Sequence, residues 1–233
     1  MANILVTGTS RGIGRSIVDR LAGQAVVGHS SRGGEREIGA DLSRPGAAER
    51  IWAEALERLG GRIDVLINNA GIFEPAPIGS SADDWLALWE RTMRINLTAS
   101  AELCRLAVLH FRETGLGGRI VNVSSRAAYR GDSPDHWHYA ASKAGMIGMT
   151  KSIARGYAGE GIYAFAVCPG FTVTGMVDEY LESRGGSAFL RDIPLGRPAE
   201  ADEVAETVRW LALDAPPSAT GAVVDVNGAS FVR

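Results

Sequence analysis

A stretch near the start of the chain decides the fold: residues 3–14 read NILVTGTSRGIG, a short apolar strand that runs directly into a glycine-rich turn. A helical pattern follows, because Ile13, Ile17, Val18 and Leu21 fall on one helical face. Such a turn presents backbone N–H groups and a helix N-terminus to a phosphate group. The glycines could serve only close helix–strand packing, but the order of strand, turn and helix favours a dinucleotide site.

The composition places the chain among ordinary globular proteins. It has 233 residues, 45% hydrophobic and 22% charged, with a net charge of -3. We expect one soluble, cytoplasmic domain over residues 1–233, because there is no signal peptide and no apolar run of about 20 residues. The charge makes no case for nucleic acid or membrane partners. Cys104 and Cys168 suit buried positions, and the four histidines lack metal-ligand spacing, so we expect no metal.

Strands and helices alternate along the rest of the chain. Further strands are expected at 25–29, 36–42, 63–67, 119–123, 162–167 and 222–226, and helices from 45 and at 83–113, 139–156 and 200–213. Only a short link joins the second and third strands, which leaves little room for a helix there. This alternation predicts an α/β fold: a doubly wound parallel sheet of about seven strands with helices on both faces.

The end of the second strand bears on which dinucleotide would bind. In dinucleotide folds, an acid about 20 residues beyond the glycines holds the ribose 2′-OH, whereas an arginine accommodates a 2′-phosphate. Here the strand ends in Ser30, Ser31 and Arg32, with no acid before Glu35, and Arg11 lies in the glycine turn. A solvated basic loop would look the same, but two guanidinium groups and two hydroxyls favour NADP(H) over NAD(H).

Polar and small residues follow two further strands. Asn68-Asn69-Ala70-Gly71 ends the fourth, and Ser124-Ser125 ends the fifth. Tyr139 and Lys143 then lie four apart, on one face of a helix. An ammonium group beside a phenol favours the ionised phenol, and a serine hydroxyl at the same point can hydrogen-bond the oxygen that the phenol protonates. Tyr-x-x-x-Lys alone is weak, but the carboxyl ends of parallel strands gather these residues at one edge.

Taken together, these motifs resemble the short-chain dehydrogenase/reductase family over essentially the whole chain, and its 3-oxoacyl-[acyl-carrier-protein] reductase branch in particular. The resemblance implies a single-domain Rossmann fold with a catalytic tetrad of Asn96, Ser125, Tyr139 and Lys143. It also implies an NADPH site, with Pro169-Gly170 and Thr174 at the nicotinamide carboxamide. The residues that we assign to cofactor binding are Gly8, Ser10, Arg11, Gly12, Ile13, Gly14, Ser30, Ser31, Arg32, Asp41, Leu42, Asn69, Ala70, Gly71, Tyr139, Lys143, Pro169, Gly170, Thr172 and Thr174.

The chain departs from that branch in three places. Ser125 lies fourteen residues before Tyr139, one more than usual, although its place at the end of the fifth strand still favours it over Ser124. The short link after Arg32 leaves the adenosine pocket open. Asn227-Gly228-Ala229 replaces the usual Asp-Gly-Gly near a subunit contact.

The family mechanism is reduction of a carbonyl by hydride transfer from NADPH, with Tyr139 as general acid/base. Lys143 and the oxidised nicotinamide are expected to lower the pKa of Tyr139. Ser125 would orient the carbonyl oxygen, and Asn96, which could also be an ordinary exposed helix residue, would position a water beside Lys143. Three hypotheses stay open: an NADPH-dependent ketoreductase, an NAD(P)+-dependent secondary-alcohol dehydrogenase, and a non-catalytic dinucleotide-binding regulator.

The substrate is not legible from the sequence. Loop 126–138 and a lid at 172–190 are expected to form the pocket for a small carbonyl substrate, either free or bound to a carrier protein. Their aromatic residues either line that pocket, which would suit an apolar or aromatic ketone, or anchor loops to the core. His136 and His138 could contact the substrate, but we interpret them as exposed loop residues. Family members are usually homotetramers built on two long helices. The apolar residues that could permit such a contact are Leu103, Leu106, Met146 and Ile147.

Overall fold

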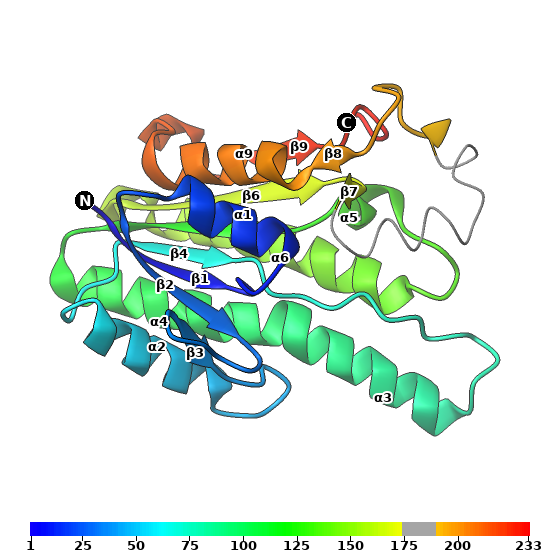
Figure 1. Ribbon diagram of the computed structural model, residues 1–233, viewed down its shortest axis with the longest axis horizontal. Helices are drawn as coiled ribbons and strands as arrows, with labels where there is room; N and C mark the ends of the chain where they lie inside the picture. The colour runs from blue at the N-terminus through cyan, green and yellow to red at the C-terminus, as the bar shows by residue number, and fades with distance from the viewer. Residues whose placement is uncertain (174–189) are drawn as a thin grey trace.

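In the computed structural model, which describes residues 1–173 and 190–233, a seven-stranded parallel sheet crosses the molecule (Figure 1). Its strands lie in the order β3-β2-β1-β4-β5-β6-β9. Their bounds are Asn3–Thr7 (β1), Ala25–Ser30 (β2), Glu37–Gly39 (β3), Val65–Asn68 (β4), Gly118–Val123 (β5), Ile162–Pro169 (β6) and Val223–Val226 (β9). The order reverses between β1 and β4, which is where ligands bind in sheets of this kind. The predicted fold class is confirmed.

Two helical layers cover the sheet. Helices α1 (Gly12–Arg20) and α9 (Ala201–Leu213) lie on one face, and α2 (Ala47–Arg58), α4 (Ala99–Thr114) and α6 (Trp137–Tyr157) lie on the other (Figure 1). The strands are apolar on both sides because both sides are buried. Side chains alternate between the two cores: Leu5 faces the α2–α4–α6 layer, whereas Ile4 and Val6 face the α1–α9 layer.

The link between β2 and β3 contains no helix, as the sequence suggested, but β3 is shorter than the expected strand at 36–42. Residues 31–36 turn tightly, and Gly33 packs so closely on Gly39 that a Cβ at Gly33 would stand 2.8 Å from the Gly39 Cα atom. The α1 face of β2 and β3 therefore has no helix over it from this link. Helix α2 begins at Ala47 rather than at Pro45, after Gly46 in a left-handed conformation with φ 78°.

The long helix expected at 83–113 is interrupted. Helix α3 (Ala82–Met93) ends in a π-helical turn, Arg94–Thr98, before α4 begins. Asn96 lies inside that turn and is fully buried, so it is not an ordinary exposed helix residue. A π turn inside a helix is rare and frequently marks a functional site.

The remaining short elements lie around the carboxyl edge and the helix ends. Loop 126–138 contains a short helix, α5 (Ala127–Arg130), and most of the expected lid at 172–190 lies outside the described residues. Strands β7 (Thr172–Val173) and β8 (Ala199–Glu200) form a second, two-stranded parallel sheet that the sequence did not reveal. Single 3-10 turns occupy Ala158–Glu160 and Pro217–Ala219.

The residues expected to permit a subunit contact are inward-facing. Leu103, Met146 and Ile147 are buried in the single chain, and Leu106 packs partly against the core. That part of the expectation is wrong, because the helices use these side chains to cover their own sheet. Cys104 and Cys168 are buried and free, as expected. Among the described residues, no helix is long and apolar enough to cross a bilayer.

Candidate active site

The glycine turn and the end of β4 interlock at the reversal of strand order. Gly8 has φ +73°, and a Cβ there would stand 2.7 Å from the Ala70 Cα atom; a Cβ at Gly14 would stand 1.9 Å from the Gly8 carbonyl oxygen. Asn69 Nδ2 donates to the Thr7 and Gly8 carbonyl oxygens, 3.0 Å away in both cases. Only glycine fits at Gly8 and Gly14, so no side chain at these two positions covers the backbone of the turn.

The N-terminus of α1 lies at the end of this glycine turn. Helix α1 begins at Gly12, and its N-cap residue, Arg11, gives no side-chain cap to the first-turn N–H groups. Uncapped N–H groups at a helix start form a site for a phosphate group. The residues present therefore fit the pyrophosphate of a dinucleotide, with Ser10 and Arg11 exposed beside it.

The adenosine side of the site differs from the expectation at one residue. Ser31 and Arg32 are exposed as predicted, but Ser30 is buried, and its hydroxyl donates to Glu37 Oε2 at 2.7 Å. Glu37 Oε1 also accepts from Thr9 Oγ1 at 2.6 Å. Burial disfavours the charged carboxylate, yet the hydrogen bonds from these two hydroxyls outweigh it and lower the pKa of Glu37.

Glu37 therefore takes up the Ser30 hydroxyl that we had assigned to the cofactor. Sequence reasoning missed this carboxylate because it comes from β3 rather than from the end of β2. The shortness of the link after Arg32 was the only available signal, since it brings β3 back within seven residues of Ser30.

The end of β5 and the start of α6 bring Ser125, Tyr139 and Lys143 together. The Ser125 hydroxyl lies near enough to the Tyr139 hydroxyl to lower the pKa of the phenol, and Ser125 Oγ accepts from the Ala127 N–H at 3.1 Å. Lys143 Nζ lies 5.8 Å from the centre of the Tyr139 ring and donates to the Val123 carbonyl oxygen at 2.9 Å. Helical spacing places the lysine one turn behind the phenol.

The two serines are distinguished by their partners. Ser124 Oγ donates to the Lys143 carbonyl oxygen at 2.8 Å, which ties the end of β5 to α6. The Ser125 hydroxyl instead faces the phenol. The extra residue before Tyr139 falls in the loop with α5 and does not displace Ser125.

Burial, rather than Lys143, dominates the pKa of Tyr139. Desolvation raises the pKa of Tyr139 to about 12, although the hydrogen bond from Ser125 works in the opposite direction. Desolvation also lowers the pKa of Lys143 to about 8. The net pKa of the phenol thus lies above its ordinary value, because desolvation favours the neutral form of each group. The expected effect of Lys143 and the oxidised nicotinamide on this pKa stays a prediction. At neutral pH Tyr139 is protonated, the state needed to donate a proton.

Asn96 connects the π turn to the segment after β4. Its Oδ1 accepts from the Ile72 N–H at 2.8 Å, and its Nδ2 donates to the Ile72 carbonyl at 3.0 Å and to Ser142 Oγ at 3.3 Å. Gly71 lies between Asn96 and the lysine: a Cβ at Gly71 would stand 3.3 Å from Asn96 Oδ1 and 3.4 Å from Lys143 Nζ. Asn96 thus helps to fix the Gly71–Ile72 segment that packs beside Lys143.

The other assigned residues lie along the same carboxyl edge. Pro169 ends β6, the Gly170 N–H donates to the Val226 carbonyl at 2.9 Å, and Thr172 Oγ1 donates to the Gly170 carbonyl at 3.2 Å. Asp41 and Leu42 follow β3; Asp41 is exposed, whereas Leu42 is buried in the core. Thr174 lies outside the described residues.

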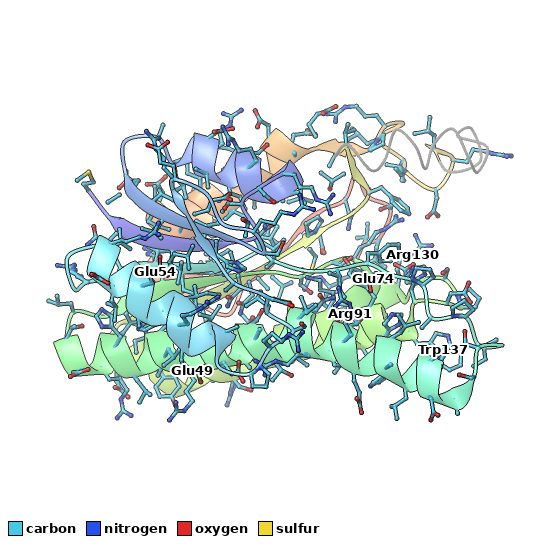
Figure 2. All side chains as sticks on the ribbon, turned by 60° about the horizontal axis from the view of Figure 1, so that its bottom comes forward. Glu49, Glu54, Glu74, Arg91, Arg130 and Trp137 are labelled. Atoms are coloured by element: carbon cyan, nitrogen blue, oxygen red, sulfur yellow. The ribbon has the colours of Figure 1, made fainter. Side chains whose placement is uncertain are left out.

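Aromatic side chains surround the phenol. Phe73 contacts Tyr139 edge-on at 4.8 Å between ring centres and stacks on His136 at 3.9 Å. His138, expected to be exposed, is buried with its Nε2 atom 2.9 Å from the Glu74 carbonyl oxygen. Figure 2 shows Trp137, Glu74 and Arg130 at one end of the molecule, away from Glu49 on α2. Across residues 1–173 and 190–233, no His, Cys, Asp or Glu cluster could hold a metal ion.

Comparisons with known proteins agree with this geometry. The model of a family described as enoyl-(acyl carrier protein) reductase matches residues 8–229. The 3-oxoacyl-[acyl-carrier-protein] reductase FabG of Haemophilus influenzae is 35% identical over 98% of this chain and 97% of its own length. An uncharacterized short-chain type dehydrogenase/reductase of Sinorhizobium fredii is 39% identical over 97% of this chain, which spans 43% of that longer protein.

Two solved structures share the fold over nearly their whole length. The ligand-free aldohexose dehydrogenase of Thermoplasma acidophilum is 29% identical with a TM-score of 0.86, covering 99% of this chain and 94% of that one. A structure described as a putative 2-deoxy-d-gluconate 3-dehydrogenase from Agrobacterium tumefaciens, with bound NADP, is 28% identical with a TM-score of 0.88, covering 100% and 97%. The chain belongs to the short-chain dehydrogenase/reductase family.

Proposed function

We propose that the protein is an NADPH-dependent ketoreductase, which reduces a ketone or a 3-oxoacyl group to a secondary alcohol. The observation that carries this proposal is that Ser125, Tyr139 and Lys143 come together, with the Ser125 hydroxyl near enough to the phenol to act on its pKa, Lys143 one turn behind and the glycine turn at the same sheet edge. A protein that only senses a dinucleotide has no need of that arrangement, which argues against the regulator.

Each residue of the tetrad has a role that its contacts support. In the reduction, the C=O π bond would break as its carbon receives a hydride and its oxygen receives the proton of Tyr139, and Ser125 would donate a hydrogen bond to that oxygen. The phenol suits this role because its raised pKa keeps it protonated at neutral pH. Lys143, with a pKa of about 8, can hold or release a proton behind the phenol, and Asn96 positions the Gly71–Ile72 segment beside it.

A bound nicotinamide dinucleotide would supply the hydride and keep the oxidised ring. The glycine turn and the start of α1 would hold its pyrophosphate, and Asn69 to Gly71 would help to bind it. Support for NADPH comes from the exposed Ser10, Arg11, Ser31 and Arg32, and from the NADP in the Agrobacterium relative. Arginine beside hydroxyls suits a 2′-phosphate.

The Glu37 carboxylate favours a second candidate, an NAD+-dependent secondary-alcohol dehydrogenase. An acid in this pocket accepts a hydrogen bond from a ribose 2′-OH and repels a 2′-phosphate. We expect Glu37→Gln, which removes the charge and keeps the shape, to raise the NADPH-to-NADH ratio of kcat/KM about tenfold, a change worth about 1.4 kcal/mol. An unchanged ratio would remove Glu37 from cofactor selection.

Family membership also supports proposals about the location, the oligomeric state and the substrate of the protein. We propose a cytoplasmic homotetramer that acts on a small carbonyl substrate, either free or attached to a carrier protein. FabG of Haemophilus influenzae, a 3-oxoacyl-[acyl-carrier-protein] reductase by name, is the basis for the carrier. Light scattering tests the tetramer, and comparing an acyl-carrier thioester with its short thioester analogue tests the carrier.

The direct test is a steady-state scan of NADPH and NADH oxidation against a panel of ketones, with the reverse reaction run on the matching alcohols. The proposal expects ketone-dependent oxidation of NADPH that exceeds that of NADH. A preference for NAD+ and alcohols would select the dehydrogenase. Tight dinucleotide binding without turnover of any ketone or alcohol would select the regulator.

A further inference from the structure

Arg126 is a buried cation directly after Ser125. Its backbone N–H donates to the Pro169 carbonyl at 2.9 Å, so the residue is fixed between the ends of β5 and β6 at the start of α5. Its side chain is 8% exposed, and its guanidinium carbon lies 4.2 Å from the centre of the Phe171 ring. The guanidinium group is therefore buried at the carboxyl edge of the sheet, on the residue that directly follows Ser125.

The charge of Arg126 is incompletely compensated. Among the described residues, no acceptor lies within hydrogen-bond distance of its Nη1 atom. The carboxylate paired with it is Asp192, whose Oδ2 lies 3.6 Å from Arg126 Nη1 and is itself hydrogen-bonded to Arg130 Nη1. Asp192 is 50% exposed, so two guanidinium groups share one half-solvated carboxylate. Burial and the neighbouring Arg130 both lower the pKa of Arg126.

A buried arginine cannot relieve this cost by losing its proton. Burying a charge without a full partner is costly, and truncating one partner of a buried pair typically costs several kcal/mol. The buried Nη1 atom therefore keeps a strong, planar donor without a hydrogen-bond acceptor among the described residues, and an anion bound beside Arg126 would supply that acceptor. A guanidinium group matches carboxylate and phosphate oxygens in the same way.

We propose that the substrate carries an anionic group, a carboxylate or a phosphate ester, and that Arg126 binds it. The inference rests on the proposed function, because it names the substrate class of the same site. Arg126 is then a specificity-determining residue that orients the carbonyl toward Ser125 and Tyr139. Asp192 holds the guanidinium group while the site is empty and competes with the anion for it.

A purely structural role for Arg126 predicts a different effect of Asp192→Asn on the reduction of anionic substrates. If the Arg126–Asp192 pair only anchors the chain that follows residue 190, then Arg126→Gln and Asp192→Asn break the same contact and impair every substrate alike. If Arg126 binds the substrate anion, Arg126→Gln impairs only anionic substrates. Asp192→Asn then improves them, because the competing carboxylate is gone.

The test compares charged substrates with neutral partners of the same shape. Arms for the carboxylate use 2-, 3- and 4-oxopentanoate with their methyl esters, and an arm for the phosphate uses dihydroxyacetone phosphate with dihydroxyacetone, all with the holoenzyme. We expect Arg126→Gln to lower kcat/KM for the anion by about 10- to 100-fold, as for a hydrogen bond to a charged group. For the neutral partner, which has no anion for Arg126 to bind, kcat/KM should change by less than about threefold.

Two controls keep the result interpretable. Arg112→Gln breaks an exposed pair with Glu160, away from the site, and should leave every substrate unchanged. Calorimetric binding of the matching hydroxy acids and their methyl esters, with NADP+ present, gives a readout that does not need turnover. There, wild type should bind the acid at least about tenfold more tightly than the ester, and Arg126→Gln should abolish that difference.

The outcomes separate the two proposals. Acids bound and reduced no better than their esters, or equal losses for both in Arg126→Gln and Asp192→Asn, would overturn the anion site while leaving ketone reduction intact. Acid binding that depends on Arg126 without reduction of any ketone would keep the anion site and overturn the ketoreductase.

Discussion

Two buried cations flank the end of β5, and their surroundings differ. Lys143 is 4% exposed and Arg126 is 7% exposed, and burial lowers the pKa of both. Lys143 Nζ donates to the Val123 carbonyl and approaches the Met146 sulfur at 3.7 Å, whereas Arg126 Nη1 has no hydrogen-bond partner among the described residues. Lysine can also become neutral near pH 8, and arginine cannot.

The difference shows how the site divides its work. Lys143 is held by the chain itself, and in the proposed mechanism it would act on every substrate, because it stands behind the phenol that would donate the proton. Arg126 leaves one donor open, so its contribution depends on the substrate. In this proposal, the hydrogen-bonded Lys143 supports the reduction of every ketone, whereas Arg126, which has an unused donor, selects among substrates.

Removing Lys143 should have the largest effect in this pair. We expect Lys143→Met to lower kcat about 10³-fold for charged and neutral ketones alike, which is the range for losing a group that supports proton transfer. Lys151→Met is the control, since Lys151 is exposed on the same helix. If only the anionic ketones lost activity in Lys143→Met, the division between the two cations would be wrong. Stopped-flow or steady-state NADPH oxidation measures it.

The pH dependence of stability should separate the two cations next. The unfolded chain keeps the Lys143 proton up to its ordinary pKa of 10.5, whereas the folded chain releases it above about 8. Between these values the unfolded state binds more protons, so stability rises with pH. Below pH 8, holding Lys143 charged lowers the free energy of unfolding by at most about 3 kcal/mol. This cost disappears progressively as the pH rises from about 8 to 10.5.

Urea unfolding of wild type, Lys143→Met and Arg126→Met between pH 7 and 10 measures this effect. The free energy of unfolding of wild type relative to Lys143→Met should rise across that window. The difference between wild type and Arg126→Met should stay flat. A flat Lys143 difference would show that its pKa is not lowered by folding.

A smaller effect is expected from the Gly71–Ile72 segment beside Lys143. Gly71→Ala introduces a Cβ at 3.3 Å from Asn96 Oδ1, which is tighter than most contacts, and at 3.4 Å from Lys143 Nζ, so Asn96 must shift by a few tenths of an ångström beside Lys143. We expect kcat to fall about tenfold, since small misplacements of catalytic groups are costly, with little change in melting temperature. Gly79→Ala is the control, because nothing lies within 4 Å of its Cβ position. Equal activity of the two variants would contradict a tightly positioned Lys143.

The parts of the molecule built on local patterns were predictable from the sequence. The parallel sheet follows from apolar strand runs that alternate with amphipathic helices, and the position of the glycine turn and Asn69 at one sheet edge follows from chain order. The π turn at 94–98 was not, because a shift in backbone hydrogen bonding leaves no periodic mark in side-chain types. The short β3 depends on Gly33 packing against Gly39, a tertiary contact.

The polar side chains with long-range partners were the hardest to place. Glu37 reaches Ser30 because the short link without a helix returns the chain to β3 beside β2. His138 is buried, and its Nε2 atom pairs with the Glu74 carbonyl, 64 residues away in the chain. The pKa of Tyr139 depends on how deeply its hydroxyl is buried, which Tyr-x-x-x-Lys spacing does not encode. Arg126 was passed over as a loop residue because charge in a loop is usually solvated.

The most direct test of the proposed chemistry is the turnover and cofactor affinity of Tyr139→Phe, with Tyr163→Phe on β6 as control. The account predicts that NADPH oxidation falls at least about 10³-fold with the best ketone, because the phenolic proton is lost. It also predicts that the NADPH dissociation constant stays within about threefold, a difference below 1 kcal/mol. Near-wild-type turnover in Tyr139→Phe would contradict the central claim that Tyr139 protonates the substrate.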